Sequence, residues 1–295
     1  MPKHAGTATD LPVLVLHTGA GSGASPEALE ARREVVEHVI DAVWPEIAAG
    51  MPAVDAVTET VALLEAEPSC NAGRGAILQS DGMARLSASC MDGARQKFSG
   101  VMLATHLTHP SRLARALQDR DESVLGPLGA QLLARELGIP PENPVTPERA
   151  ERWVEYLRGH VGHYERGGTV GAVVLDTEGR IAAATSTGGA VISFPERVSD
   201  SATVAGNYAS PFAGISCTGV GEQIVDDALA ARIETRVRDW RSIIEASDQA
   251  YDEATALHRR YGWIGIDHQR NWVLYTTTEA MASGMRCGGV GRNSA

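Results

Sequence analysis

The chain has 295 residues and a mass of 31.2 kDa, and 43% of its residues are hydrophobic, so it has enough apolar material for a large core. Its formal net charge of -11 and its pI of about 5.3 disfavour a nucleic-acid partner, because such binding depends on clustered Lys and Arg. The apolar run from Leu11 to Leu16 is too short for the core of a signal peptide or for a membrane span. We therefore expect a cytoplasmic protein with no membrane partner.

The four cysteines are scattered along the chain, at Cys70, Cys90, Cys217 and Cys287. They form no CxxC pair and have no cluster of histidines at the spacing of metal ligands, so neither a zinc site nor a disulfide framework is indicated. We expect four buried thiols that pack as small hydrophobic side chains.

The first half of the chain predicts alternating strands and helices. Ser25 followed by Pro26 is a helix-start signal, and valines and leucines after residue 53 recur at helical spacing. In chain order we expect a strand at 13–17, a helix from 26 to about 44, a helix at 53–67, two short strands within 68–93, helical segments within 110–136, and a linker at 136–168 that contains a short helix capped by Thr146 and Pro147.

The second half predicts two hairpins separated by a helix. Residues 170–187 form two apolar runs around Thr177-Glu178-Gly179, and residues 262–278 repeat this design. A strand is expected to end near Thr218, and a helix to follow from about Glu222 to Val237. Because strands and helices are grouped in both halves, we expect stacked sheets with helices outside them.

The glycine-rich stretch TGAGSG at 18–23 follows the first predicted strand. Its glycines match neither GxGxxG nor GxxxxGK[ST], which disfavours a nucleotide-binding loop. We interpret it as a tight turn that allows a close backbone approach.

Thr169 begins an apolar strand directly after two glycines, at the end of the predicted linker. A hydroxyl nucleophile needs a base, and the α-amine of the same residue can serve if the bond between Gly168 and Thr169 is cut. Glycine before that bond permits a strained turn, and a free α-amine with a pKa of about 7.7 to 8.0 suits proton transfer near neutrality. The pattern alone also fits a simple β-branched strand starter.

Two further threonines precede glycines, in Thr187-Gly188-Gly189 and in Thr218-Gly219. Hydroxyls and backbone N–H groups at strand ends can form an oxyanion hole, although each step also fits a turn or a helix cap.

Arg197 and Asp200 lie three residues apart in a polar segment. A guanidinium suits a carboxylate and an aspartate suits an ammonium, so the pair can hold an amino-acid zwitterion. The alternative is a surface ion pair that contributes little to stability.

Several ordered motifs resemble those of the plant-type asparaginases and isoaspartyl aminopeptidases, which are N-terminal nucleophile hydrolases. The motifs are HTGAG (17–21), NAGRG (71–75), SCMDG (89–93), GGTVGAVVLD, AAATSTGG, PERVSDS and SCTGVGE. The resemblance implies an α+β fold, a four-layer αββα sandwich, in a single domain (1–295) that cleaves itself into an α part (1–168) and a β part (169–295). It also implies a homodimer of cleaved units that releases aspartate from L-asparagine or β-aspartyl peptides, with no cofactor in the chemistry.

The resemblance also assigns roles to individual residues. Thr169 would be nucleophile and base with Thr187 assisting, Gly168 would precede the cut, Thr218 and the Gly219 N–H would form the oxyanion hole beside Asn71, and Arg197, Asp200 and Gly221 would bind the substrate. A structural Na⁺ site is implied in the loop around Glu65, Glu67, Cys70 and Asn71.

The chain departs from the family pattern at Thr18, where the family usually has Gly, and between Asp200 and Tyr208, which is one residue shorter than usual. Two alternatives remain open at this point. One is an uncleaved relative that binds amino acids or peptides without turnover, and the other is a threonine hydrolase of glycosylated asparagine or protein substrates.

Overall fold

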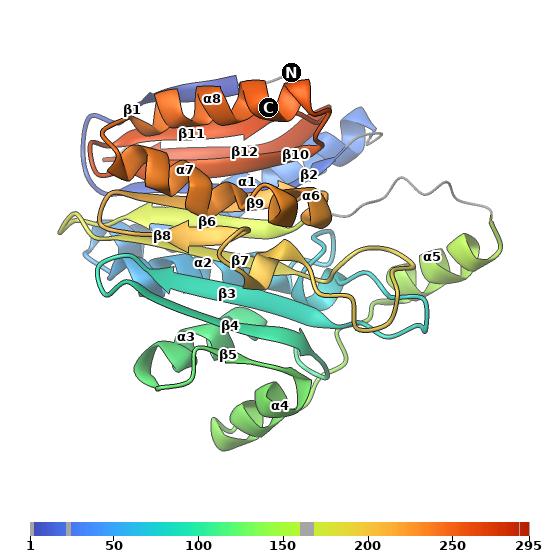
Figure 1. Ribbon diagram of the computed structural model, residues 1–295. Coiled ribbons are helices and arrows are strands. Elements are labelled where there is room, and N and C mark those ends of the chain that lie inside the picture. Colours follow the sequence, from blue (N-terminus) through green and yellow to red (C-terminus); the bar gives the residue numbers. More distant parts are fainter. Residues whose placement is uncertain (1–2, 22–24, 160–167, 289, 295) are drawn as a thin grey trace.

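Two β-sheets form the centre of the molecule in this computed structural model, which describes residues 3–21, 25–159, 168–288 and 290–294 (Figure 1). The smaller sheet has the strand order β1 (Lys3–Thr7), β11 (Asn271–Thr276), β10 (Tyr261–Asp267), β9 (Ala213–Gly219) and β8 (Asn207–Ala209). The larger has the order β13 (Val290–Ser294), β12 (Ala280–Cys287), β2 (Val13–Gly21), β6 (Val170–Leu175), β7 (Ile181–Thr187), β3 (Leu86–Asp92), β4 (Lys97–Ala104) and β5 (Val124–Leu125). Neighbouring strands are antiparallel except for the β4–β5 pair.

The sequence of strand β6 is apolar throughout because both faces of the strand are buried. Ala172 and Val174 pack toward helices α1 (Pro26–Ala48) and α2 (Ala53–Ala66), whereas Val173 and Leu175 pack toward the smaller sheet. A strand enclosed on both faces reads as a continuous hydrophobic run. The start of β6, and with it Thr169, is therefore fixed by packing on both sides.

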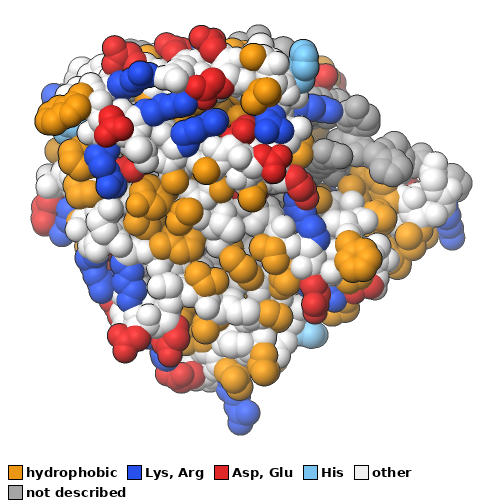
Figure 2. Space-filling view, viewed as in Figure 1, with side chains coloured by type: hydrophobic (Ala, Val, Ile, Leu, Met, Phe, Trp, Pro, Cys, Tyr) orange, Lys and Arg blue, Asp and Glu red, His pale blue; other side chains and the backbone are white. Residues whose placement is uncertain are grey.

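Helices α7 (Leu229–Arg238) and α8 (Ile243–Ala256) cover the other face of the smaller sheet, where Ile233 and Ala250 join a core with Trp263. Their outer surface carries charges of both signs (Figure 2). Arg236 of α7 pairs with Glu253 of α8 at 2.7 Å. The fold is thus mixed α/β, with two sheets and helices packed against them.

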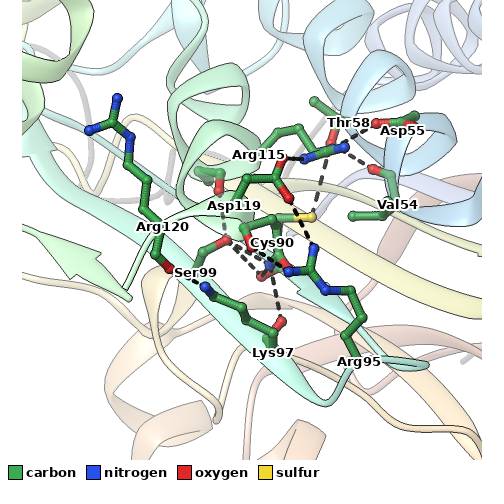
Figure 3. Close-up of polar contacts among 12 residues, drawn as sticks. Val54, Asp55, Thr58, Cys90, Arg95, Lys97, Ser99, Arg115, Asp119 and Arg120 are labelled. Atoms are coloured by element: carbon green, nitrogen blue, oxygen red, sulfur yellow. Dashed lines mark hydrogen bonds and ion pairs between the residues drawn. The ribbon is translucent and has the colours of Figure 1, made fainter. Parts of the chain in front are cut away.

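Helices α3 (Pro110–Ala116) and α4 (Pro127–Glu136) pack against β3 and β4. In Figure 3, Arg115 pairs with Asp55 of α2 at 2.6 Å and with Asp119 at 2.9 Å. Gln118, in the short 3₁₀ turn η2 (Leu117–Asp119), donates to Ser99 Oγ and to two backbone carbonyls. These contacts attach α3 and η2 to the larger sheet and to α2.

The predicted helix starts are confirmed. Ser25 caps α1 by accepting a hydrogen bond from the Ala28 N–H, and Thr146 caps α5 (Pro147–Leu157) by accepting from the Arg149 N–H. Helix α5 lies at the edge of the molecule, away from the stacked sheets (Figure 1). Both predicted hairpins are also present, as β6–β7 and β10–β11.

Several predicted boundaries were wrong. The helix expected at 222–237 is two helices, α6 (Gly221–Asp226) and α7, because Ala228 has a φ of 46°, which no right-handed helix tolerates. The helical segments expected within 110–136 are present as α3, η2 and α4, but the strand β5 interrupts them. Of the two strands expected within 68–93 only β3 lies there, and its partner β4 begins at Lys97.

The tight turn expected at 18–23 was also wrong in its described part. Strand β2 continues to Gly21, which pairs with Ala280 of β12, and Gly23 lies outside the described residues. Helix α8 was not predicted, although Ser242 and Glu245 form a capping box at its start.

All four cysteines are buried and unpaired, as expected. Within the described ranges, no helix is long and apolar enough to cross a membrane.

Candidate active site

A cavity of about 350 Å³ lies beside the start of β6 and the ends of β7 and β9. Because β6 and β7 are antiparallel, the start of β6 lies next to the end of β7. The loop 189–199 and the start of α6 complete the wall. The predicted site residues that line the cavity are Thr169, Thr187, Arg197, Gly219 and Gly221.

Thr169 and Thr187 face each other across the β6–β7 ladder. The register pairs Val170 with Ser186, and one step further along it Thr169 lies opposite Thr187. The Thr169 hydroxyl lies 3.5 Å from Ser201 Oγ. The Thr187 hydroxyl accepts a hydrogen bond of 3.0 Å from the Gly189 N–H, which leaves its own O–H to donate. Two hydroxyls are thus held at one edge of the cavity.

Gly168, which precedes Thr169, crosses the backbone of β2 at Gly19. A Cβ on Gly168 would lie 2.2 Å from Gly19 Cα, and a Cβ on Gly19 would lie 2.1 Å from Gly168 Cα. Only glycine fits either position, because both Cβ atoms would overlap backbone. The close approach expected of the glycine-rich stretch is therefore made with the residue before Thr169.

Thr218 is buried behind the cavity and does not line it. Its hydroxyl accepts a hydrogen bond of 3.1 Å from the Ala20 N–H, so it joins β9 to β2. Gly219, the next residue, does line the cavity, with a φ of 130° that favours glycine. Of the two residues predicted to form an oxyanion hole, the structure brings Gly219 to the wall.

Asn71 also lies behind the wall. Its Nδ2 donates to the Gly189 carbonyl at 2.8 Å, its Oδ1 accepts from the Ile77 N–H at 2.9 Å, and its own carbonyl accepts from the Gly188 N–H. These bonds hold the turn that follows Thr187.

Three polar atoms converge over Gly221 at the start of α6. A Cβ at Gly221 would lie 2.7 Å from Asp200 Oδ1, 2.9 Å from Arg197 Nη2 and 2.9 Å from Ser199 Oγ. Glycine therefore leaves space beside a cation, a hydroxyl and a carboxylate, the groups that suit an amino-acid head group. Ser199 belongs to the PERVSDS motif, but no role was predicted for it.

Asp200 is only 1% exposed, and its Oδ2 has no hydrogen-bond partner within the described structure. Burial raises the pKa of this carboxyl to about 6, against the opposing effects of the hydrogen bond from Ser199 (2.7 Å) and of the Arg197 charge. The carboxylate is therefore ionised at neutral pH but close to its titration range.

Arg197 forms an ion pair with Glu222, whose side chain is 64% exposed at the cavity rim, at a distance of 2.7 Å from Arg197 Nη2. The Glu222 carboxylate thus already contacts the Arg197 guanidinium, which was predicted to bind the carboxylate of the substrate.

Gln79 fixes the backbone that carries Arg197. This buried side chain accepts from the Glu196 N–H at 2.9 Å and from Arg85 at 2.6 Å, and it donates to the Arg197 carbonyl at 3.4 Å. This role of Gln79 was not predicted, because Gln79 lies more than 100 residues away in sequence from the loop that it supports.

His17, in the predicted HTGAG motif, lies beneath the nucleophile strand. Its Nε2 is 3.0 Å from Ser216 Oγ, which is 2.7 Å from Thr185 Oγ1. Burial lowers the pKa of His17 to about 3, against the smaller opposing effect of the nearby Thr169 backbone. The ring is neutral at physiological pH, and a glycine at position 171 leaves room for it.

The side chains of the loop predicted to bind Na⁺ do not form a group of available metal ligands. The Glu65 carboxylate accepts two hydrogen bonds from Ser111, and burial raises the pKa of the Cys70 thiol to about 12, so that thiol is neutral. The described ranges contain no group of three or more His, Cys, Asp or Glu side chains suited to a metal. Backbone carbonyls do gather here: those of Pro68 and Cys70 lie 2.3 and 2.0 Å from the position of a Cβ on Gly75.

Comparison with known proteins agrees with the motifs. The sequence model of the family described as asparaginase matches residues 10–291. The chain is 43% identical over 272 residues to an isoaspartyl peptidase/L-asparaginase of Synechocystis sp., an alignment that covers 88% of this chain and 82% of that protein. It is 34% identical over 289 residues to a plant-type L-asparaginase of Pyrococcus abyssi, covering 91% and 94%, and 34% identical over 280 residues to an isoaspartyl peptidase/L-asparaginase of Rattus norvegicus, covering 91% and 84%. The chain therefore belongs to the asparaginase family.

Proposed function

We propose that this chain is a self-processing amidohydrolase that releases aspartate from L-asparagine and from β-aspartyl dipeptides. One observation carries the proposal: Thr169, preceded by a glycine that tolerates no side chain, lines the same cavity as Arg197 and Gly221. The names of the relatives, isoaspartyl peptidase/L-asparaginase and plant-type L-asparaginase, support the same reaction.

In the self-processing step, the Thr169 hydroxyl attacks the carbonyl carbon of Gly168. The C–N bond between Gly168 and Thr169 breaks as an ester to Thr169 Oγ forms, and water then hydrolyses this ester. The products are a carboxylate on Gly168 and a free α-amine on Thr169. The chain is thereby divided into 1–168 and 169–295.

In turnover, the Thr169 α-amine takes the proton of the Thr169 hydroxyl, which attacks the side-chain carbonyl carbon of the substrate. The Gly219 N–H at the cavity wall stabilises the oxyanion, and the Thr187 hydroxyl donates to Thr169 Oγ. Thr218, which was predicted to share the oxyanion role, instead holds the β9 end that carries Gly219, through its hydrogen bond from the Ala20 N–H. The amide C–N bond breaks, and ammonia or an amino acid leaves with the proton. Water then attacks the acyl-enzyme, releases aspartate and restores the hydroxyl.

Substrate is held at the position over Gly221. Arg197 binds the α-carboxylate of the aspartyl group, and Ser199 binds its α-ammonium together with Asp200, whose Oδ1 is the carboxylate oxygen nearest to Gly221. Asn71 acts indirectly, by holding the turn after Thr187.

Other features of the family extend the proposal. The two sheets, with α1 and α2 on one side and α7 and α8 on the other, would form the αββα sandwich of N-terminal nucleophile hydrolases. Two cleaved units would form a homodimer. The four unpaired cysteines support a reducing, cytoplasmic location.

We also propose that Na⁺ binds the segment 65–71 through backbone carbonyl oxygens, since Glu65 and Cys70 are otherwise engaged or neutral. Glu67 and Asn71 belong to the same loop. The thermal midpoint should be higher in sodium chloride than in choline chloride at equal ionic strength, and equal midpoints would reject this site.

The deciding experiment combines intact mass, N-terminal sequencing and aspartate release. We expect a smaller fragment that begins at Thr169 and a preparation that releases aspartate from both L-asparagine and β-aspartyl dipeptides. A chain that stays at 31.2 kDa and releases no aspartate would reject the proposal.

A further inference from the structure

Phe194 lies on the wall of the catalytic cavity and is 82% exposed. A single exposed aromatic residue on a protein surface is common and needs no explanation. This one differs by its position, because it lines the cavity that contains Thr169 and Arg197.

The loop around Phe194 is held by hydrogen bonds on both sides. The Ser80 N–H donates to the Ser193 carbonyl at 2.9 Å, and the Arg197 N–H donates to the Phe194 carbonyl at 3.0 Å. Gln79 binds the next turn through the Glu196 N–H. These bonds fix the backbone of the loop and so keep Phe194 beside the cavity.

The cavity has both polar and apolar lining residues. Its polar lining residues include Arg197, Ser199 and Glu222. Its lining also includes Ala190, Val191 and Phe194, which are close in sequence with Ser193 among them, and we call these three the apolar part. Figure 2 shows hydrophobic side chains beside charged ones at the surface of the segment between β7 and β8. This apolar part lies between Gly189, which is bonded to Thr187, and Arg197 along the loop.

The two proposed substrates use such a surface differently. L-Asparagine has ammonia as its leaving group, which makes no apolar contact. A β-aspartyl dipeptide has an amino acid as its leaving group, and its side chain must occupy the cavity beyond the scissile amide. An aromatic or large aliphatic side chain would cover Phe194 and remove its apolar surface from water.

We propose that Ala190, Val191 and Phe194 form a subsite for the leaving group, so that the enzyme prefers β-aspartyl dipeptides whose second residue is large and apolar. This inference rests on the proposed function, and Phe194 is its main specificity-determining residue. The ligand class is thus a β-aspartyl dipeptide with an aromatic or branched aliphatic second residue.

The test compares kcat/KM for β-aspartyl-phenylalanine, β-aspartyl-leucine, β-aspartyl-glycine and L-asparagine. In the unaltered enzyme we expect the first two to exceed β-aspartyl-glycine by about tenfold. Phe194→Ala should remove this advantage and leave L-asparagine hydrolysis within about twofold, and Phe194→Leu should keep most of the advantage. Leu128→Ala is a matched control, since Leu128 is a 69% exposed residue of α4 that does not line the cavity.

Several results would overturn the subsite. One is an equal kcat/KM for the glycine and phenylalanine dipeptides, and another is an equal loss on all substrates in Phe194→Ala, which would make Phe194 a support of the loop. A fall in oligomer mass of Phe194→Ala by ultracentrifugation would assign the side chain to a contact between copies of this chain instead.

Failure of the proposed function gives a different result, because no substrate would then release aspartate. In that case, calorimetric titration of the unaltered chain with β-aspartyl-phenylalanine and β-aspartyl-glycine still decides the subsite. Tighter binding of the phenylalanine dipeptide supports it, and equal or absent binding overturns it.

Discussion

The two halves of the site are built differently. Thr169, Thr187 and Gly219 stand at the ends of strands whose ladders and core contacts fix them, whereas Arg197 and Phe194 stand on a loop fixed by hydrogen bonds from residues 78–80. Strand ends tolerate little movement, which suits a reaction centre. A loop accepts substitutions without disturbing the sheets, which suits substrate selection. Substitutions in the first half should therefore change kcat, and substitutions in the second should change KM.

The largest effect is expected at the strand end. Thr169→Ala removes the nucleophile and should reduce aspartate release by more than about 10³-fold, while the chain remains uncut at 31.2 kDa. Thermal unfolding should change little, because the hydroxyl makes one long contact of 3.5 Å with Ser201. Thr169→Ser, which keeps a hydroxyl, should recover part of both cleavage and activity. A cleaved and active Thr169→Ala protein would place the nucleophile elsewhere.

A smaller effect, confined to binding, is expected at Gly221. A methyl group there would lie within 2.9 Å of Arg197, Ser199 and Asp200 and would fill the head-group position. Overpacking of this kind costs about 1–3 kcal/mol, so KM should rise roughly 5- to 150-fold with kcat nearly unchanged. Gly126→Ala is the matched control, because a Cβ at that position meets nothing within 4 Å. Unchanged KM in Gly221→Ala would mean that substrate binds elsewhere.

The pH dependence should separate the two halves as well. The Asp200 pKa is about 6, so the carboxylate loses its charge as pH falls through 6 and KM should rise about tenfold per pH unit below it. By contrast, kcat should fall as pH drops below the pKa of the Thr169 α-amine, for which the reference value is about 7.7 to 8.0, because the protonated amine cannot act as a base. Ser199→Ala removes the hydrogen bond that lowers the Asp200 pKa and should move the KM limb to higher pH. A KM limb that stays in place in Ser199→Ala, or is still present in Asp200→Asn, would contradict the assignment.

The raised pKa of Asp200 means that its charged form, which substrate binding needs, lowers the stability of the fold. Because the pKa of Asp200 is raised from 3.8 to about 6 on folding, this group favours the folded state most below pH 3.8, and that contribution is lost as pH rises to about 6. At neutral pH the buried carboxylate therefore lowers the free energy of unfolding, and Asp200→Asn should raise it. A higher thermal midpoint together with a higher KM would identify Asp200 as a residue kept for binding rather than for stability.

The sequence predicted the strand-end half of the site better than the loop half. Strand periodicity placed Thr169 and Thr187 at adjacent strand ends, because register follows from the apolar runs and the short hairpin between them. It gave no information on Gln79, Ser199 or Glu222, whose roles depend on where distant loops meet. It also joined α6 to α7, because the positive φ of Ala228 is imposed by the tertiary structure and has no local sequence signal.

The smallest effect is expected at Glu222. Its carboxylate competes with the substrate carboxylate for Arg197, so Glu222→Gln should lower KM, but by less than about fivefold, because an ion pair with a 64% exposed partner contributes little in water. The change should shrink as ionic strength rises, since salt screens exposed charges. Measuring KM and kcat for L-asparagine at low and high salt tests both points. A rise in KM would instead mean that Glu222 orients the guanidinium for substrate, and a fall in kcat would mean that the loop and the strand ends do not act separately.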